Sequence, residues 1–194
     1  LQDFVIQADG KFLVLSDFYS GSQDYRVLRY NSNGTPDTSF GNNGSITTDI
    51  GNVEFAKNIL TQSDGKFIVA GTTLTTGTST TSVFLARYNS NGTFDTSFNS
   101  NGKKTLTYTG FNEFYNFEFQ TDGKIVLVFS SYVSSVPKLN VVKLNANSTL
   151  DTTFGTNGVA NVTAPNNFGN GLKKFKIQSD GKLFIMSATF QMVN

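Results

Sequence analysis

The 194-residue chain contains no cysteine and no histidine, and only 15% of its residues are charged. The missing cysteines exclude disulfides and thiol chemistry, and the missing histidines remove the commonest zinc ligand. Without either residue type, the chain cannot form a Ser-His or Cys-His nucleophile pair. The net charge is +1, so no global field draws the chain to nucleic acid or to an anionic membrane. The sequence therefore predicts no cofactor and no metal.

Long apolar runs are also missing. No run approaches the roughly 18 residues of a transmembrane helix, so we expect no membrane insertion. No signal peptide is visible, and the chain begins at Leu1 and not at methionine. We interpret the sequence as a fragment or a processed product of a larger protein.

One pentapeptide pattern, Gln-x-Asp-Gly-Lys, begins at four positions that are 55, 58 and 58 residues apart. A fixed period of this size is typical of a repeat architecture. Apolar residues alternate before each copy and run continuously after it, which predicts two strands, the second of them covered on both faces. Asp-Gly between such strands predicts a type I′ hairpin turn. The turn positions are Asp9, Gly10, Asp64, Gly65, Asp122, Gly123, Asp180 and Gly181.

A second motif follows a third predicted strand and spans Arg29–Gly41, Arg87–Phe98 and Lys143–Gly155. It contains Asn-Gly in the first two copies, again a type I′ signal, and Asn147-Ser148 in the third. An aspartate after this turn can accept a backbone N–H two or three residues on and hold a tight turn. A phenylalanine three residues later is predicted to plug the core. These positions are Asp37, Phe40, Asp95, Phe98, Asp151 and Phe154.

A short fourth strand follows each of these motifs, so each unit holds four short antiparallel strands. The units span 1–50, 51–109, 110–164 and an incomplete 165–194. This pattern predicts an all-β fold in which residues 1–194 form one partial β-propeller of about 3.5 blades. A β-solenoid is the alternative. Because a propeller ring typically needs 4–8 blades, we expect further blades from chain on both sides or from a partner.

The two motifs together resemble the delta-60 repeat family of bacterial, β-propeller-like proteins. The resemblance covers nearly the whole chain. Asn99 replaces the glycine that follows the phenylalanine in the other two copies, and the third unit lacks Asn-Gly. The resemblance implies a large secreted or surface protein without catalytic residues, hence an extracellular or cell-surface location.

Segment lengths vary at one predicted end of the sheets. The loop between the second and third strands and the segment between units differ in length, whereas the other two connections do not. Because binding residues concentrate on loops of rigid scaffolds, we expect a protein or glycan partner at the variable end. The candidates, expected to be exposed, are Tyr19, Asn112, Tyr132 and Asn166. Asn31, Asn33 and Asp37 could instead bind calcium, but one carboxylate per copy favours a structural turn.

The function predicted from these features is a binding or structural scaffold, and not an enzyme. The alternative is a glycan-active hydrolase or lyase with a pocket at the propeller axis, which would need two carboxylates about 5–9.5 Å apart. The acids that could supply them are Asp17, Asp24, Glu54 and Glu113. A passive spacer within a large adhesin is a third possibility.

Overall fold

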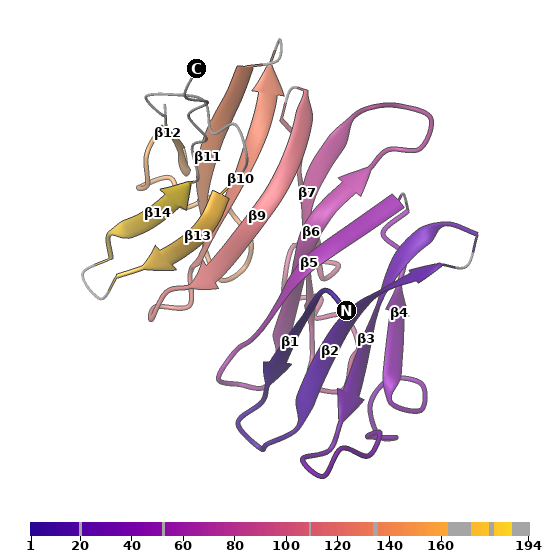
Figure 1. The fold of residues 1–194 in the computed structure, drawn as a ribbon. Coiled ribbons are helices and arrows are strands. Elements are labelled where there is room, and N and C mark those ends of the chain that lie inside the picture. Colours follow the sequence, from indigo (N-terminus) through magenta and orange to yellow (C-terminus); the bar gives the residue numbers. More distant parts are fainter. Residues whose placement is uncertain are drawn as a thin grey trace, which may run out of the picture. The chain divides into compact units, whose positions relative to one another are not determined.

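The computed structural model describes residues 1–19, 21–51, 53–108, 110–133, 136–162, 172–178 and 181–187. Within these ranges every regular element is a β-strand, and the strands form three sheets of four strands and one of two (Figure 1). The predicted all-β fold with about 3.5 four-stranded blades is confirmed. The described residues contain no helix that could cross a membrane.

Each four-stranded sheet is a simple antiparallel meander in chain order. Sheet 1 consists of β1 (Asp3–Ile6), β2 (Phe12–Tyr19), β3 (Gln23–Tyr30) and β4 (Ser45–Thr48). Sheet 2 consists of β5 (Val53–Thr61), β6 (Phe67–Leu74), β7 (Thr81–Tyr88) and β8 (Lys103–Leu106). Sheet 3 consists of β9 (Phe111–Phe119), β10 (Ile125–Val133), β11 (Val136–Leu144) and β12 (Val159–Val162). Sheet 4 consists of β13 (Leu172–Ile177) and β14 (Leu183–Ser187).

The chain divides into two compact units. Unit 1, Leu1–Thr107, holds sheets 1 and 2, and unit 2, Tyr108–Asn194, holds sheets 3 and 4. Each unit has its own core, and each is described here by itself.

In unit 1 the two sheets pack face to face. We call the face of a sheet that meets the following sheet its C-face, and the face that meets the preceding sheet its N-face. The C-face of sheet 1 presents Leu13, Leu15, Tyr25 and Val27, and the N-face of sheet 2 presents Ile59, Phe67, Val69, Ala86 and Tyr88. Every one of these side chains is buried. Removing apolar surface from water stabilises by about 25 cal/mol per Å², so this junction stabilises the unit.

Unit 2 repeats this junction with other residues. Val126, Val128, Leu139 and Val141 of sheet 3 pack against Phe175, Ile177, Leu183 and Ile185 of sheet 4. Of the predicted second strands, β6 packs Phe67 and Val69 into the unit 1 core, and β10 packs Val126 and Val128 into the unit 2 core. In β2 only Leu13 and Leu15 are fully buried, and in β14 Phe184 is exposed.

The turns between the first two strands are three-residue loops, so the prediction of type I′ turns is wrong. In the first unit the Gln7 carbonyl accepts the Gly10 N–H at 3.0 Å, and only Gly10 has a positive φ, of 81°. This is a type I turn closed by a left-handed glycine. The physical reason is the Asp9 carboxylate, which accepts the Lys11 N–H at 3.1 Å and so holds its own residue at negative φ.

The Asn-Gly turns have the same three-residue geometry, for the same reason. Asn33 Oδ1 accepts the Thr35 N–H at 3.1 Å, and the Asn31 carbonyl accepts the Gly34 N–H at 2.9 Å. The third unit keeps these bonds although Ser148 replaces the glycine, so Ser148 is held at a φ of 75°.

Candidate functional site

One end of each complete sheet carries the same ion cluster, built around the repeated aspartate. In sheet 1, Asp37 Oδ2 lies 2.8 Å from Lys11 Nζ and 2.8 Å from Arg29 Nε. Lys66 and Arg87 hold Asp95 in sheet 2, and Lys124 and Lys143 hold Asp151 in sheet 3. In each cluster one lysine comes from the turn between the first two strands, the second cation comes from the third strand, and the aspartate comes from the turn after that strand. The cluster therefore joins the two turns at this end of the sheet. We call it the constant end.

The aspartates of these clusters are buried. The hydrogen bonds from Lys11 and then Ser39 hold the pKa of Asp37 well below its usual range. Burial raises the pKa of Asp95, but hydrogen bonds from Lys66 and Ser97 outweigh that effect and the net pKa is low. The aspartates are therefore ionised at neutral pH.

The oxygens of the constant end are used within the turns. Asp37 Oδ1 accepts the N–H of Ser39 at 3.1 Å and its hydroxyl at 2.6 Å, which confirms the tight turn predicted for this aspartate. Its other oxygen carries two cations. Because these bonds engage both oxygens of the Asp37 carboxylate, the geometry favours a structural turn over a calcium site.

The constant end also joins the sheets of unit 1. Arg29 donates to the Ser90 carbonyl, and the Asn91 carbonyl accepts the Gly41 N–H at 3.1 Å. The Arg29 guanidinium lies 4.5 Å from the centroid of the Phe40 ring, and Phe40 is fully buried as predicted. Phe98 is likewise fully buried, whereas Phe154 is only partly buried. These contacts serve the scaffold and leave little of this end for a ligand.

The opposite end of the sheets holds the connections of variable length, and we call it the variable end. In unit 1 it consists of the β2–β3 connection with Tyr19, which is 76% exposed, and the β6–β7 connection, residues 75–80, all exposed. Thr75 and Thr80 close this loop with a backbone hydrogen bond of 3.0 Å.

Three carboxylates meet beneath these loops. Asp24 begins the buried part of β3, Asp49 follows β4 and Glu54 lies in β5, and one oxygen of each lies within 4.8 Å of one oxygen of both others. Asp24 and Glu54 are buried and Asp49 is exposed. Asp24 accepts a hydrogen bond from the Ser22 hydroxyl at 2.8 Å, and Glu54 accepts one from the Thr73 hydroxyl at 3.4 Å. Oxygen ligands of this kind suit a hard cation such as Ca²⁺.

A buried pair of tyrosines lies in the unit 1 core. The hydroxyls of Tyr25 and Tyr88 are 2.5 Å apart, and the Thr48 hydroxyl is 2.7 Å from that of Tyr88. Burial raises the pKa of Tyr25 well above its usual value, and the charge of Tyr88 adds to the effect. Burial likewise raises the pKa of Tyr88. Both phenols are therefore neutral donors and acceptors that hold the two sheets together.

The acidic cluster occurs only at the first pair of sequence repeats. Counted from the repeated motifs, the residues equivalent to Asp24, Asp49 and Glu54 in the following units are Ser82, Thr107 and Asn112. The hydroxyls of Ser82 and Thr107 are 2.8 Å apart. The same repeat positions therefore carry three acids in the first two sequence repeats and neutral side chains in the following ones. Sequence reasoning considered Asp24 and Glu54 but missed Asp49, which this position-by-position comparison would have found.

The four predicted binding residues differ in their surroundings. Tyr19 is exposed, and Tyr132 is half-buried with its ring 6.0 Å from that of Phe111. Asn112 is fully buried, so its predicted exposure is wrong. The physical reason is that its amide donates to the carbonyls of Tyr108 and Gly110 at 2.9 and 3.0 Å. Asn166 lies outside the described residues.

Of the four acids considered for catalysis, two converge. Asp24 and Glu54 come from different repeat units and belong to the cluster described above. Asp17 is exposed and accepts a hydrogen bond from the Gln2 amide at 2.5 Å. Neither Asp17 nor Glu113 belongs to that cluster of described residues.

Two shallow pockets lie elsewhere on the described residues. In unit 1, a pocket of about 410 Å³ is lined by Arg26, Thr47, Tyr88 and Phe94 among others. In unit 2, a pocket of about 330 Å³ is lined by Tyr108, Ser131, Lys138 and Asn140 among others. None of the clustered carboxylates lines either pocket.

Sheets of four antiparallel strands that recur along the chain and pack face to face define a β-propeller repeat protein. A family model described as a domain of unknown function (DUF5122) β-propeller matches residues 7–40, 62–98 and 120–154. The chain belongs to this family, which is the delta-60 type of repeat that the two motifs resemble. A search of curated proteins finds no match.

Proposed function

We propose that this chain is a secreted or cell-surface β-propeller segment that acts as a scaffold and presents its variable end to protein or glycan partners. The observation that carries the proposal is the contrast between the two ends. The constant end repeats one ion cluster in three sheets, whereas the variable end differs in loop length and in charge from unit to unit. Loops on a rigid scaffold are where binding residues concentrate.

Two groups of exposed residues support a binding role for the variable end. Tyr19, the last residue of β2, offers an exposed aromatic ring, and tyrosine gives large contact area at low entropic cost. Residues 75–80 offer hydroxyls on a loop closed by its own backbone hydrogen bond. Hydroxyls and aromatic rings together suit a polar surface such as a glycan.

The test uses the whole chain on a glycan array and in pull-downs from culture supernatant and cell envelope. One variant carries Tyr19→Ala, and a second replaces residues 75–80 by glycine and serine. Ser32→Ala with Thr38→Ala, both exposed at the constant end, is the matched control. We expect at least a tenfold loss of binding in the first two variants and none in the control. Equal binding by all three would show that the variable end is not the site.

We also propose that the role is non-catalytic. One observation favours the glycan-active alternative, because carboxylate oxygens of Asp24 and Glu54 lie within 4.8 Å, close to the about 5–5.5 Å of retaining glycosidases. Their burial argues against it, since Glu54 is fully buried and a substrate needs access to both acids. Incubation with a panel of polysaccharides, with reducing ends as readout, decides the question. Hydrolysis that disappears in Glu54→Gln would establish the enzyme.

The proposed location rests on the family resemblance. Protease treatment of intact cells tests it: a surface protein is degraded, and an internal one is protected until the cells are broken. A chain that binds no partner in any assay would instead support the passive spacer.

A further inference from the structure

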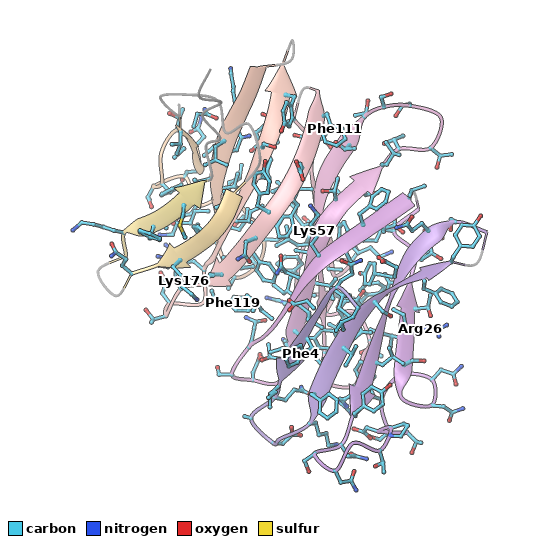
Figure 2. The ribbon with its side chains drawn as sticks, in the orientation of Figure 1. Phe4, Arg26, Lys57, Phe111, Phe119 and Lys176 are labelled. Atoms are coloured by element: carbon cyan, nitrogen blue, oxygen red, sulfur yellow. The ribbon has the colours of Figure 1, made fainter. Side chains whose placement is uncertain are left out.

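Five asparagines among the described residues are directly followed by glycine, and all five lie exposed in turns of the constant end: Asn33, Asn43, Asn91, Asn101 and Asn157. The β3–β4 connection, which holds two of them, lies at the lower end of sheet 1 in Figure 2, and side chains project from it. A glycine nitrogen can attack the carbonyl carbon of a preceding asparagine side chain, because no side chain of its own crowds the approach. The surroundings of each asparagine therefore decide which of them react.

Three of the five side chains are held by hydrogen bonds. Asn33 Oδ1 accepts the N–H of Thr35 at 3.1 Å and its hydroxyl at 2.7 Å. Asn91 Oδ1 accepts the same two groups of the threonine two residues on, at 3.0 and 2.8 Å. Asn101 Oδ1 accepts the Lys103 N–H at 2.8 Å. Ring closure turns the side chain toward the following nitrogen, so these bonds must break before the reaction.

Asn43 and Asn157 occupy one repeat position, and their side chains are not held. Both are exposed, and no described residue bonds to either side-chain amide. Their backbones have φ values of 48° and 53°, in a region that residues with a side chain rarely adopt. Asn101 has the same repeat position in sheet 2 but does not share this conformation. The turns at Asn43 and Asn157 therefore combine a free amide with a strained backbone.

The attacking nitrogens do not distinguish the five pairs. The Gly34 N–H donates to the Asn31 carbonyl at 2.9 Å, and the Gly44 N–H donates to the Phe40 carbonyl at 2.8 Å. Each pair can react only while its turn is locally open, which short surface turns permit. Opening the turn at Asn43 breaks no side-chain hydrogen bond of that residue, whereas opening the turn at Asn33 breaks two. The first turn should therefore open more often.

We propose that Asn43 and Asn157 are sites of spontaneous backbone modification. The nitrogen of Gly44 forms a bond to Cγ of Asn43, the bond from Cγ to the amide nitrogen breaks, and that nitrogen leaves as ammonia with the proton of the Gly44 N–H. Water then opens the succinimide ring at either of its two carbonyl carbons and gives aspartate or isoaspartate. Asn157 and Gly158 react in the same way. This inference goes beyond the proposed binding role, because it concerns the constant end.

The modification alters the turn that supports an ion cluster. The Gly44 carbonyl accepts the Arg29 N–H at 2.9 Å, and the Gly158 carbonyl accepts the Lys143 N–H at 2.9 Å. Arg29 and Lys143 are the third-strand cations of the clusters in sheets 1 and 3. Isoaspartate routes the main chain through the side-chain carbon, so it adds one methylene directly before the glycine. Sheets 1 and 3 should therefore loosen at the constant end as the protein ages, and sheet 2 should not.

The test compares the five asparagines within one sample. The whole folded chain is incubated at mildly alkaline pH and digested, and each Asn-Gly peptide is followed by mass spectrometry, with isoaspartate separated by chromatography. We expect Asn43 and Asn157 to be converted about tenfold faster than Asn33 and Asn91, because breaking two further hydrogen bonds corresponds to about that factor. In a parallel sample unfolded in urea, the five should react at similar rates.

Two variants sharpen the comparison. Asn43→Gly removes the reactive amide and places at this φ the residue best suited to it, so the circular dichroism spectrum should stay the same and the peptide should stay unconverted. Thr35→Val removes one bond to Asn33 and should speed conversion of Asn33 alone.

Three results would overturn the proposal. In the first, Asn33 and Asn91 react as fast as Asn43 and Asn157 in the folded chain. In the second, Asn43 and Asn157 stay intact when folded although they react in urea. In the third, the contrast between the two groups persists in urea, which would assign it to local sequence and not to the turns.

Discussion

At the constant end, three sheets build one cluster of an aspartate with two cations, with lysine-to-aspartate distances of 2.8, 2.9 and 2.9 Å. At the variable end, the same repeat positions hold three acids in one place and hydroxyls in the next. Both ends cap the same strands, so the difference does not come from the sheets. The repeated ion cluster holds together the two turns at the constant end of each sheet, so the variable end can differ from one sheet to the next.

The contrast also separates an acid that is held by two cations from acids that lie close to one another. Asp37 is buried with a lysine and an arginine on one oxygen, which is the condition under which buried ions are tolerated. In the acidic cluster, Asp24 and Glu54 are buried close to each other and to Asp49.

The largest expected effect is that of acid on the constant end. The pKa values of Asp37, Asp95 and Asp151 are all lowered by their hydrogen bonds and nearby cations. A carboxylate with a lowered pKa in the folded state stabilises it above the unfolded pKa of about 3.9, and that stability is lost as the pH falls through the folded value. We expect the urea midpoint to be constant near neutral pH and to fall steeply below about pH 4. A midpoint that stays constant to pH 2 would contradict the ion clusters.

The next largest effect is expected from removing one aspartate. Asp95→Ala leaves Lys66 and the buried Arg87 without that carboxylate, and breaking a buried pair costs about 3 kcal/mol. Urea unfolding at pH 7 measures the loss, and the variant should also lose part of the acid sensitivity. Thr96→Ala, at the exposed neighbouring residue, is the control and should change the free energy of unfolding by less than about 0.5 kcal/mol.

Sequence predicted the strands and the constant end well because both depend on local periodicity and repetition. Alternating apolar residues place Phe4 and Ile6 on one face of β1, and a repeated aspartate implies a repeated turn. The type I′ turns were wrong because Asp-Gly fits a three-residue loop equally well. The choice between them depends on the Asp9 carboxylate and the Lys11 N–H, a contact that dipeptide preferences do not contain.

The variable end was harder to predict because its properties arise between strands that are distant in sequence. Asn112 begins a unit and looks like a loop residue, yet it lies in β9 and its amide bonds to nearby carbonyls. Asp24 and Glu54 are 30 residues apart in the chain, and only the packing of sheet 2 on sheet 1 brings them together. Loop length indicated which end varies, but not which side chains meet there.

A third prediction concerns a variant in which the variable end carries the same residue types in successive sequence repeats. Replacing the acids by their equivalents from the next units, as Asp24→Ser, Asp49→Thr and Glu54→Asn, removes three acids that offer oxygens within 4.8 Å of one another. We expect the free energy of unfolding of this triple variant to depend less on salt than that of the unaltered chain, because salt screens interactions between charges. Asp17→Asn, at an exposed acid of the same end, should have little effect. Urea unfolding at low and high salt measures the difference, and an equal salt dependence of the two chains would contradict this expectation.

A fourth prediction concerns a variant in which the turn at the constant end has glycine at the same position in all three complete sheets. Ser148 has a φ of 75° where the other two units have Gly34 and Gly92, and its buried hydroxyl has no hydrogen-bond partner. Ser148→Gly should therefore stabilise the chain by about 1 kcal/mol, since it removes both the backbone strain and an unsatisfied polar atom. The reverse change, Gly34→Ser, meets no neighbouring atom within 4 Å and should cost about 1 kcal/mol from backbone strain alone. Two changes of the same sign in urea unfolding would contradict this account.

The smallest expected effect is that of the exposed loops on stability. Tyr19 is 76% exposed and lies at the end of β2, so Tyr19→Ala removes little buried surface and should change the free energy of unfolding by less than about 0.5 kcal/mol. The same substitution at a buried ring, Tyr25→Ala, should cost at least about 3 kcal/mol because it leaves a cavity in the unit 1 core. Urea unfolding of both variants measures the two values. If Tyr19→Ala destabilised the chain as much as Tyr25→Ala, the variable end would be part of the scaffold, and its differences between units would then serve folding instead of binding.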